Sequence, residues 1–502
     1  MSEARRVMME TPKSRLDPDS SVLQQLRHIL KEKGYCEAGI TPTFGDVTLQ
    51  LPDESTPPTQ RNALLRLFHF KESVTTENAS KAFHPLTIEE LVDAGFIRVD
   101  GKNVRANVLI QPYQDLFFAI DELESQPENA LMQVSGSSLA VAHLMVRHPA
   151  RTSLDLGTGC GFLAALMAQH SEHVYAVDLN PTAVKFADFN CRWNGLQNVT
   201  CLQGSLTAPV RDQRFDLIVC NPPFMICPVP SVFSSRIMFK HSGHEGDGFC
   251  INLAREASQL LNEDGCFHMM FEWFELDGED WSAKLTKSFS GTNCDVWGMR
   301  IFSQTPEMYV REWLAGEKEM EWLAEKEKVD TEALYRQGVG YFLNQKVKSI
   351  GTGMLTMRRC SSRPNVLWFD EAPADLSEPY GESVSALFDV RIRFGDSSDP
   401  VLLDEKLVVS PDVGVIQKAK LENGNWEVTE SELNRYQGLK YCYTEASPLL
   451  LRSVALMDGN RTLRQIFELL SQEEHLALPD VIAKHLPETR QLIWFGFLIP
   501  KP

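Results

Sequence analysis

Short apolar runs alternate with helical stretches across residues 132–359, and this alternation constrains the fold more than any other feature. Short apolar runs between turn residues are typical of buried strands, and strands that alternate with helices predict a parallel sheet covered on both faces. We therefore expect an α/β domain over residues 127–362, with a late run, 353–359, as an edge strand. The five runs expected to form its core are 153–156, 173–177, 199–203, 215–220 and 266–271.

The first 126 residues have a different pattern, with apolar residues at helical spacing in 22–33 and 61–70. Residues 86–108 then read as a short helix followed by two strands around the turn Asp100-Gly101. A helix followed by a hairpin predicts a helical, winged-helix-like domain over residues 1–126. Modules of this kind bind nucleic acid in some proteins and only protein in others, and both interpretations stay open.

Residues 363–502 are expected to form a C-terminal α+β domain. Its first part, 363–399, is rich in Pro, Ser, Asp and Glu and is a candidate linker. Helical runs and a last apolar run across 449–499 resemble a second winged-helix-like module. Strands are also expected in the apolar pieces 386–394, 405–410 and 414–421.

Composition narrows the environment and the partners of the chain. No apolar run approaches the length of a membrane span, so no membrane contact is expected. The 11 cysteines contain no CxxC pair, which favours reduced thiols in a cytoplasm and predicts no metal site. The formal net charge of −19 disfavours a protein that grips long nucleic acid with its whole surface. The sequence does not determine the oligomeric state.

A glycine-rich turn follows the first expected strand, with Asp155 before Gly157, Gly159 and Gly161. Glycines let the backbone turn sharply and approach a ligand closely, although a turn with positive φ angles needs no ligand. The spacing differs from the GxGxxG pattern of dinucleotide sites. A carboxylate ahead of the first glycine suits a ligand with a charged amino group better than a pyrophosphate.

Two further loops follow the second and third expected strands. Asp178 ends the second strand, about 20 residues after the glycine turn, where a carboxylate can accept both hydroxyls of a ribose. Alternatively, Asp178 caps the next helix. Gly204 and Ser205 follow the third strand, where an adenine ring or edge would lie, and a plain turn explains them equally well.

The fourth strand ends at a four-residue motif that carries most of the functional information, Asn221-Pro222-Pro223-Phe224. Two prolines end the strand and fix the backbone, but a structural stop needs neither the asparagine nor the phenylalanine. An amide or aniline-like nitrogen is a poor nucleophile because its lone pair is delocalised. The Asn221 side-chain oxygen and the Pro222 carbonyl could accept its two N–H groups. Phe224 could stack on the planar group and face a cation.

These residues resemble the class I methyltransferases that carry an (N/D)PP(Y/F) motif. The resemblance is strongest to the methyltransferase small domain, which includes release-factor glutamine and ribosomal RNA guanine-N2 methyltransferases, and covers about residues 130–275. It implies a Rossmann-like domain that uses S-adenosyl-L-methionine, with a flanking domain on each side. The layout also resembles large bacterial proteins that have an N-terminal helical domain and a C-terminal extension.

The resemblance also implies roles for individual residues. Asp155 and the three glycines would hold the methionine part of the cofactor, and Asp178 would hold the ribose. The family often has an acid where this chain has Ser205, so an adenine contact there differs from the family pattern. Asn221 would lie between cofactor and substrate, and the target nitrogen would be bound by the whole motif, Asn221, Pro222, Pro223 and Phe224.

The expected reaction is direct transfer of a methyl group to a planar nitrogen, without a metal or a covalent enzyme intermediate. The acidic composition favours a protein side-chain amide or a small-molecule amide as acceptor. Alternatives are a base amine of ribosomal or transfer RNA, and a protein that binds the cofactor without catalysis. The loop 239–247 either closes over the substrate or is an ordinary connection. Because all cofactor motifs lie between Asp155 and Phe224, a fragment of about residues 127–362 is expected to bind cofactor.

Overall fold

The computed structural model describes most of the chain, which divides into two compact units. Unit 1 comprises Met1–Ala142, His148–Thr292 and Phe302–Arg359, and unit 2 comprises His143–Arg147, Asn293–Ile301 and Cys360–Pro502. None of the described helices is both long and apolar enough to cross a membrane. The described residues are 17–36, 60–120, 133–229, 246–315, 330–373, 375–394, 399–422, 424–444 and 446–501.

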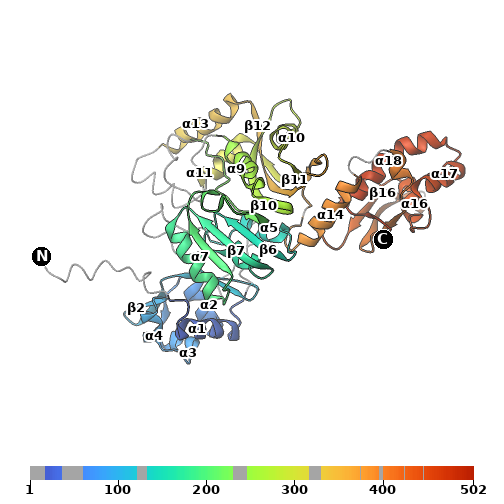
Figure 1. Ribbon diagram of the computed structural model, residues 1–502. Helices are drawn as coiled ribbons and strands as arrows, with labels where there is room; N and C mark the ends of the chain where they lie inside the picture. The colour runs from blue at the N-terminus through green and yellow to red at the C-terminus, as the bar shows by residue number, and fades with distance from the viewer. Residues whose placement is uncertain are drawn as a thin grey trace. The chain divides into compact units, whose positions relative to one another are not determined.

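An eight-stranded sheet forms the centre of the fold and confirms the expected α/β class (Figure 1). Its strand order is β13-β11-β12-β10-β9-β6-β7-β8. The strands from β10 to β8 in this order pair in parallel and correspond to the five apolar runs seen in the sequence. Their bounds are β6 Ala150–Leu156, β7 Ser171–Asp178, β8 Val199–Gln203, β9 Phe215–Cys220 and β10 Leu261–Leu276.

The chain leaves β6 in two opposite directions, first to β7 and β8 and later to β9 and β10. Right-handed crossovers then place the helices of the two halves on opposite faces of the sheet. Ligands of open α/β sheets bind at such a reversal, beyond the carboxyl ends of the strands. The helices concerned are α6 Phe162–Met167 and α7 Pro181–Trp193 in one half, and α9 Gly248–Ser258 in the other.

The strand expected at residues 353–359 is internal, so its assignment as an edge strand is wrong. It belongs to β12 Val347–Arg359, which pairs antiparallel with β10 and is followed in the sheet by β11 Cys294–Gln304. The true edge is β13 Leu367–Glu371, parallel to β11. Residues 353–357 are all buried, as expected for a strand that is covered on both faces.

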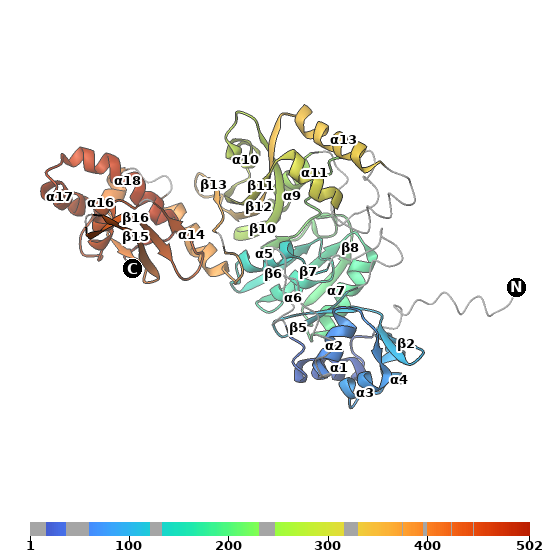
Figure 2. The same cartoon turned by 180° about the vertical axis from the view of Figure 1, so that it is seen from behind.

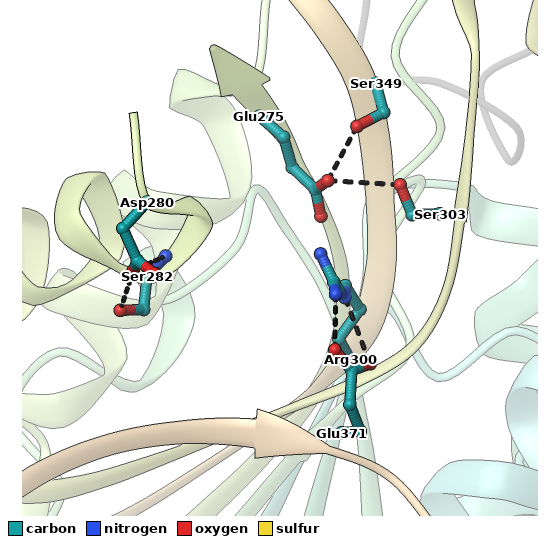
Figure 3. Close-up of polar contacts among 7 residues, drawn as sticks. All are labelled: Glu275, Asp280, Ser282, Arg300, Ser303, Ser349 and Glu371. Atoms are coloured by element: carbon teal, nitrogen blue, oxygen red, sulfur yellow. Dashed lines mark hydrogen bonds and ion pairs between the residues drawn. The ribbon is translucent and has the colours of Figure 1, made fainter. Parts of the chain in front are cut away.

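Polar contacts tie these added strands together (Figure 3). The Glu275 carboxylate of β10 accepts hydrogen bonds from Ser303 in β11 at 3.1 Å and from Ser349 in β12 at 2.6 Å. Arg300 of β11 forms an ion pair with Glu371 of β13, and its Nε donates at 3.0 Å. Glu275–Ser349 and Arg300–Glu371 join neighbouring strands, and Glu275–Ser303 links β10 to β11 across β12.

The N-terminal part of unit 1 contains a small three-stranded sheet of order β1-β3-β2 with four helices (Figure 1). The helices predicted at 22–33 and 61–70 are present with slightly shifted ends, and a hairpin surrounds Asp100-Gly101 as expected. The elements are α1 Ser21–Glu32, α2 Gln60–Phe68, β1 Val74–Thr75, α3 Thr76–Phe83, α4 Ile88–Asp93, β2 Ile97–Asp100 and β3 Asn103–Ala106.

A second hairpin, β4 Leu109–Tyr113 and β5 Leu116–Ile120, is buried along its whole length and is bound to α7. The Asn190 amide exchanges hydrogen bonds with the backbone of Ala119, at 2.8 Å for the N–H and 2.9 Å for the carbonyl. Asn194, one turn later, does the same with Phe117 at 3.0 and 2.7 Å. The hairpin is thus fastened to the central sheet's helix layer as an added strand would be.

Two helices, α11 Pro306–Ala315 and α13 Thr331–Asn344, connect β11 to β12 and pack together over β12 (Figure 2). Residues 316–329, between these two helices, lie outside the described part of the chain. The remaining helices of the central region are α5 Gly136–Leu144 and α10 Trp281–Phe289.

Unit 2 corrects two expectations for the region after residue 362. The candidate linker 363–399 contains β13 and the helix α14 Gly381–Phe394, and the strand expected at 386–394 is part of that helix. Residues 390–394 alternate between apolar and charged side chains, a pattern that is typical of a strand. However, the buried positions recur every three or four residues, as on one face of a helix. These positions are Val384, Leu387, Phe388, Arg391 and Phe394.

Arg391 is a charged residue on this buried face. Its guanidinium lies 4.3 Å from the centre of the Trp297 ring and forms an ion pair of 2.7 Å with Asp370. The rest of unit 2 has a long hairpin, a two-stranded pairing of β14 with β18, and a group of helices. Its elements are α15 Asp399–Leu403, β14 Leu407–Val409, β15 Val413–Glu422, β16 Asn425–Arg435, β17 Cys442–Tyr443, α16 Pro448–Ala455, α17 Leu463–Glu473, α18 Leu478–Trp494 and β18 Leu498–Pro500.

A fragment that starts at residue 127 lacks the β4–β5 hairpin, so we expect it to be less stable than a fragment that keeps the hairpin. Deletion of residues 1–126 removes the hairpin and exposes the face of α7 that binds it, whereas deletion of 1–106 retains both. We expect the shorter chain to have a free energy of unfolding lower by at least about 3 kcal/mol, because burial of one large apolar side chain contributes roughly 1.5–3 kcal/mol. Urea denaturation of the two truncated chains measures this difference. Equal values would show that the hairpin does not stabilise the sheet.

Candidate active site

The sequence-predicted site residues lie at the carboxyl ends of three neighbouring strands. In the register of the sheet, Leu156 of β6 is opposite Val177 of β7 and also opposite Cys220 of β9. The glycine turn, Asp178 and Asn221 each follow one of these strands. Because parallel strands end at the same edge of a sheet, the structure brings these three groups together. The backbone oxygen of Asn221 lies 4.0 Å from where a Cβ on Gly157 would stand.

The glycine turn needs its glycines for two different reasons. Gly157, Gly159 and Gly161 have φ angles of 71°, 55° and 83°, which residues with a Cβ rarely adopt. At Gly161 a Cβ would also lie 2.9 Å from the Cα of Ala187 on α7, so close helix packing excludes it. Beside Gly159, in contrast, no atom lies within 4 Å of such a Cβ. The turn therefore has open space along its outer side.

Asp155 lies beneath this turn and is completely buried. Its Oδ2 accepts hydrogen bonds from the Thr158 hydroxyl at 2.6 Å and from the Ala164 N–H at 3.0 Å, which fix the turn and the start of α6. Its Oδ1 has no hydrogen-bond partner among the described residues. Burial raises the pKa of Asp155 to about 7, although the bonds from Thr158 and Ala164 lower it.

Asp178 joins the end of β7 to the glycine turn. One carboxylate oxygen accepts the N–H of Gly159 at 2.9 Å, and the other accepts the N–H of Asn180 at 2.8 Å. Burial raises the pKa of Asp178, and the N–H groups of Asn180 and Gly159 lower it. An ionised carboxylate has about four acceptor positions, so each oxygen can still accept one more bond. The cap of α7 comes from the Asn180 side chain, which accepts from Thr182 at 2.9 Å.

Gly204 and Ser205 form the turn after β8. The N–H of Gly204 donates to the carbonyl of Asp178 at 2.9 Å, which places this turn next to the ribose-binding candidate. A Cβ on Gly204 would lie 2.3 Å from Cγ of Pro209, so local packing explains the glycine without a ligand. Ser205 is exposed, and its carbonyl accepts the N–H of Ala208 at 3.0 Å. An adenine contact at this turn stays a prediction.

Asn221 is buried at the end of β9, and hydroxyl groups orient its amide. Its Nδ2 donates to Ser137 Oγ at 3.1 Å and to Ser138 Oγ at 2.9 Å, both at the start of α5. Its Oδ1 is buried and has no hydrogen-bond partner among the described residues. The next three residues continue the turn, with Pro222 buried and with Pro223 and Phe224 partly exposed. The structure thus leaves one amide oxygen free at the predicted position of the nucleophile.

The arrangement fits the cofactor that the family resemblance implies. The open space beside Gly159 could accept the methionine part, and the unpartnered Asp155 oxygen, when ionised, would supply negative charge close to it. The free acceptor positions of Asp178 suit ribose hydroxyls. Of the loop 239–247, only Gly246 and Asp247 belong to the described residues. Asp247 is tied to the fold, because it accepts the N–H of Phe274 at 2.8 Å and pairs with Lys284.

Comparison with known families agrees with the geometry. Residues 134–272 match the methyltransferase small domain, and residues 50–107 match a domain of unknown function. The first match spans β6 to β10 and includes every residue of the candidate site. The match supports a class I S-adenosylmethionine-dependent methyltransferase domain in this part of the chain.

Individual relatives in this class are N-methyltransferases by name. A tRNA1(Val) (adenine(37)-N6)-methyltransferase of Cytophaga hutchinsonii is 29% identical over 164 residues, 32% of this chain and 68% of its own. A ribosomal protein uL3 glutamine methyltransferase of Bradyrhizobium diazoefficiens is 31% identical over 35% of this chain and 59% of its own. A release factor glutamine methyltransferase of Geobacter sulfurreducens is 43% identical over 14% of this chain and 26% of its own. The chain spans less than two thirds of the last two.

Several residues of the site were not found from the sequence. Ser137 and Ser138 lie far from Asn221 in the chain, and the run Ser-Gly-Ser-Ser before a helix signals only a helix start. Asn190 also reaches the site, because its Nδ2 donates to the carbonyl of Cys160 in the glycine turn at 2.8 Å. A completely buried asparagine in a helix is a signal only once burial is known.

The charge of Asp155 predicts how cofactor affinity depends on pH. Burial raises the pKa of Asp155 to about 7, and the ammonium group of S-adenosylhomocysteine, if bound beside it, would favour the ionised carboxylate and lower that pKa. Affinity should therefore rise with pH up to about 7 and level off above it, with a change of up to tenfold per unit. Isothermal titration between pH 5.5 and 8 measures this. An affinity that stays constant over this pH range would show that Asp155 does not contact the cofactor.

A second prediction compares the two amides of α7. Both hold the β4–β5 hairpin, but only Asn190 also bonds to the glycine turn. Asn190→Ala and Asn194→Ala should each lower the free energy of unfolding by about 1–3 kcal/mol, because buried backbone groups lose partners. Only Asn190→Ala should also weaken binding of S-adenosylhomocysteine, by about tenfold. Equal affinities of the two variants would contradict a role of Asn190 in shaping the cofactor turn.

Proposed function

We propose that this protein transfers a methyl group from S-adenosylmethionine to a planar amide or amino nitrogen. The observation that carries the proposal is the Asn221 amide. Two serine hydroxyls engage its nitrogen, and its buried oxygen has no partner among the described residues. A buried acceptor without a partner costs about 1–3 kcal/mol, so such a group is expected where a ligand completes it.

The residues of the chain act mainly by position. S-Adenosylmethionine, when bound, supplies an electrophilic methyl group. Asn221 Oδ1 and the Pro222 carbonyl would accept the two N–H groups of the acceptor and direct its lone pair toward that methyl group. Ser137 and Ser138 orient the Asn221 amide, and the two prolines restrict the backbone that carries the Pro222 carbonyl. Phe224 is partly exposed and would form one wall for the planar group.

A protein glutamine amide is the acceptor that we favour. Two relatives are glutamine methyltransferases by name, and the net charge of −19 is poorly suited to broad contact with nucleic acid. A transfer RNA adenine amine is the second candidate. The relative with that activity in its name is matched over 68% of its length, more than the other two. Both acceptors present a planar nitrogen with two hydrogens, which the same pair of oxygens could hold.

The test separates catalysis from cofactor binding. Asn221→Ala should leave the affinity for S-adenosylhomocysteine within a few-fold of wild type and lower methyl transfer by about a hundredfold, the usual scale for one lost preorganised group. Release factors, ribosomes and transfer RNA serve as acceptors, with radioactive methyl transfer as the readout. A wild-type rate of methyl transfer in the Asn221→Ala variant would show that Asn221 has no role in catalysis.

Asn221→Asp tests the acceptor oxygen separately from the amide nitrogen. A carboxylate keeps an acceptor oxygen but cannot donate to Ser137 and Ser138, whose hydroxyls can instead donate to it. Methyl transfer should therefore be faster in Asn221→Asp than in Asn221→Ala. If the wild type binds S-adenosylhomocysteine but methylates none of these acceptors, a cofactor-binding protein without catalysis becomes the better interpretation.

A further inference from the structure

A buried carboxylate and a buried phenol contact the segment that follows residues 221–224, which we call the NPPF turn. Glu272 belongs to β10 and Tyr309 to α11, and the Tyr309 hydroxyl lies 2.6 Å from Glu272 Oε2. Both side chains are nearly inaccessible to solvent, with Glu272 4% and Tyr309 3% exposed. Thr352 of β12 donates to the other carboxylate oxygen at 3.3 Å. The cofactor motifs do not include any of these residues.

Glu272 and Tyr309 both contact the backbone of one residue, Ile226. The N–H of Ile226 is 3.0 Å from Glu272 Oε2 and 2.8 Å from the Tyr309 oxygen, which is also 3.0 Å from the Ile226 carbonyl. A phenol has a single proton, which the ionised carboxylate at 2.6 Å attracts most strongly. The phenol oxygen can then accept the Ile226 N–H. Glu272 and Tyr309 therefore hold Ile226 through its N–H group, and the phenol has no second proton for the Ile226 carbonyl.

Ile226 is the second residue after Phe224, so this contact fixes the exit of the NPPF turn. The entry is already fixed, because β9 pairs with β6 up to Cys220. The residues after the turn also enter a buried apolar cluster with the helices α11 and α13. Its members include Ile226, Cys227, Val229, Val310, Trp313, Leu334 and Phe342.

Stability alone does not explain the choice of these residues. Burial raises the pKa of Glu272 to about 7, against the bonds from Tyr309 and Ile226, which shows how strongly the site disfavours charge. A well-packed apolar pair is often as stable as a buried polar one. A polar pair does, however, fix the direction of a backbone group, which apolar packing does not.

We propose that Glu272 and Tyr309 are positioning residues, which set the NPPF turn at the distance from the cofactor that methyl transfer requires. This inference rests on the proposed function of the turn. Neither side chain would touch the acceptor or the cofactor. Their loss would instead let the Pro222 carbonyl and Phe224 shift, and a displacement of about 1 Å can reduce a rate a hundredfold.

The experiment uses the full chain with Tyr309→Phe, which removes one hydroxyl and keeps the ring. The matched control is Tyr341→Phe on α13, whose side chain packs against the same apolar cluster. Hydrogen–deuterium exchange of the peptide containing residues 221–229 should rise about tenfold in Tyr309→Phe and stay unchanged in Tyr341→Phe. The kcat for methyl transfer should fall at least tenfold in Tyr309→Phe, with an unchanged affinity for S-adenosylhomocysteine.

Glu272→Gln and Glu272→Leu extend the comparison. A glutamine keeps one acceptor oxygen, so its kcat should lie between those of the wild type and the leucine variant. Unchanged exchange and unchanged kcat in Tyr309→Phe would overturn the inference, even if Glu272→Leu does not fold. If the wild type transfers no methyl group, the proposed function fails. The exchange data still decide whether Tyr309 holds the turn.

Discussion

The pairing of β6 with β9 is the contact on which the candidate site depends. These two strands start the two halves of the sheet, and their register sets Leu156 opposite Cys220. Every residue after these positions leaves the sheet at one edge, so a shift by two residues would move the NPPF turn about 7 Å along the strand. The glycine turn and Asn221 would then no longer meet. The register of these two strands therefore also determines the geometry of the site.

Buried polar groups maintain that geometry at three levels. Asp155 fixes the glycine turn from below, Asp178 joins the turn to the neighbouring strand, and Asn190 joins it to the N-terminal hairpin. Each of these side chains bonds to at least one backbone group, and Asp155 also accepts a bond from the Thr158 hydroxyl. Such bonds fix the path of the chain, which apolar packing leaves less well defined. Among the buried carboxylate and amide side-chain oxygens of the described residues, Asp155 Oδ1 and Asn221 Oδ1 have no hydrogen-bond partner, and both lie in the candidate site.

The sequence predicted those parts of the fold that depend on local patterns. The five parallel strands and the glycine turn follow from apolar runs and from the spacing around Gly157, and both are present. The errors arose where a local pattern was ambiguous. Residues 390–394 alternate like a strand, but the burial of Leu387 and Arg391 shows a helix. The position of β12 inside the sheet depends on which strand follows it in space, and no local pattern contains that information.

The same distinction applies to the site. Asp178 and Asn221 could be found because each directly follows a strand, and strand ends are visible in the sequence. Ser138, Glu272 and Tyr309 contact the NPPF segment across long separations in the chain, so only the folded structure relates them to it. The assignment of these residues to catalysis or positioning stays a prediction. The structure supplies the contacts that make each assignment testable.

The close approach of Gly161 to α7 has a consequence for how this protein can change over evolution. The missing side chain lets the Cα of Ala187 lie 2.9 Å from the position of a Cβ. A methyl group at residue 161 would push α7 outward, and Asn190 would move with it, away from the β4–β5 hairpin. A larger residue at position 161 should thus also disturb the hairpin, although the hairpin is remote from it in the sequence. The N-terminal hairpin therefore limits which substitutions the cofactor turn can tolerate.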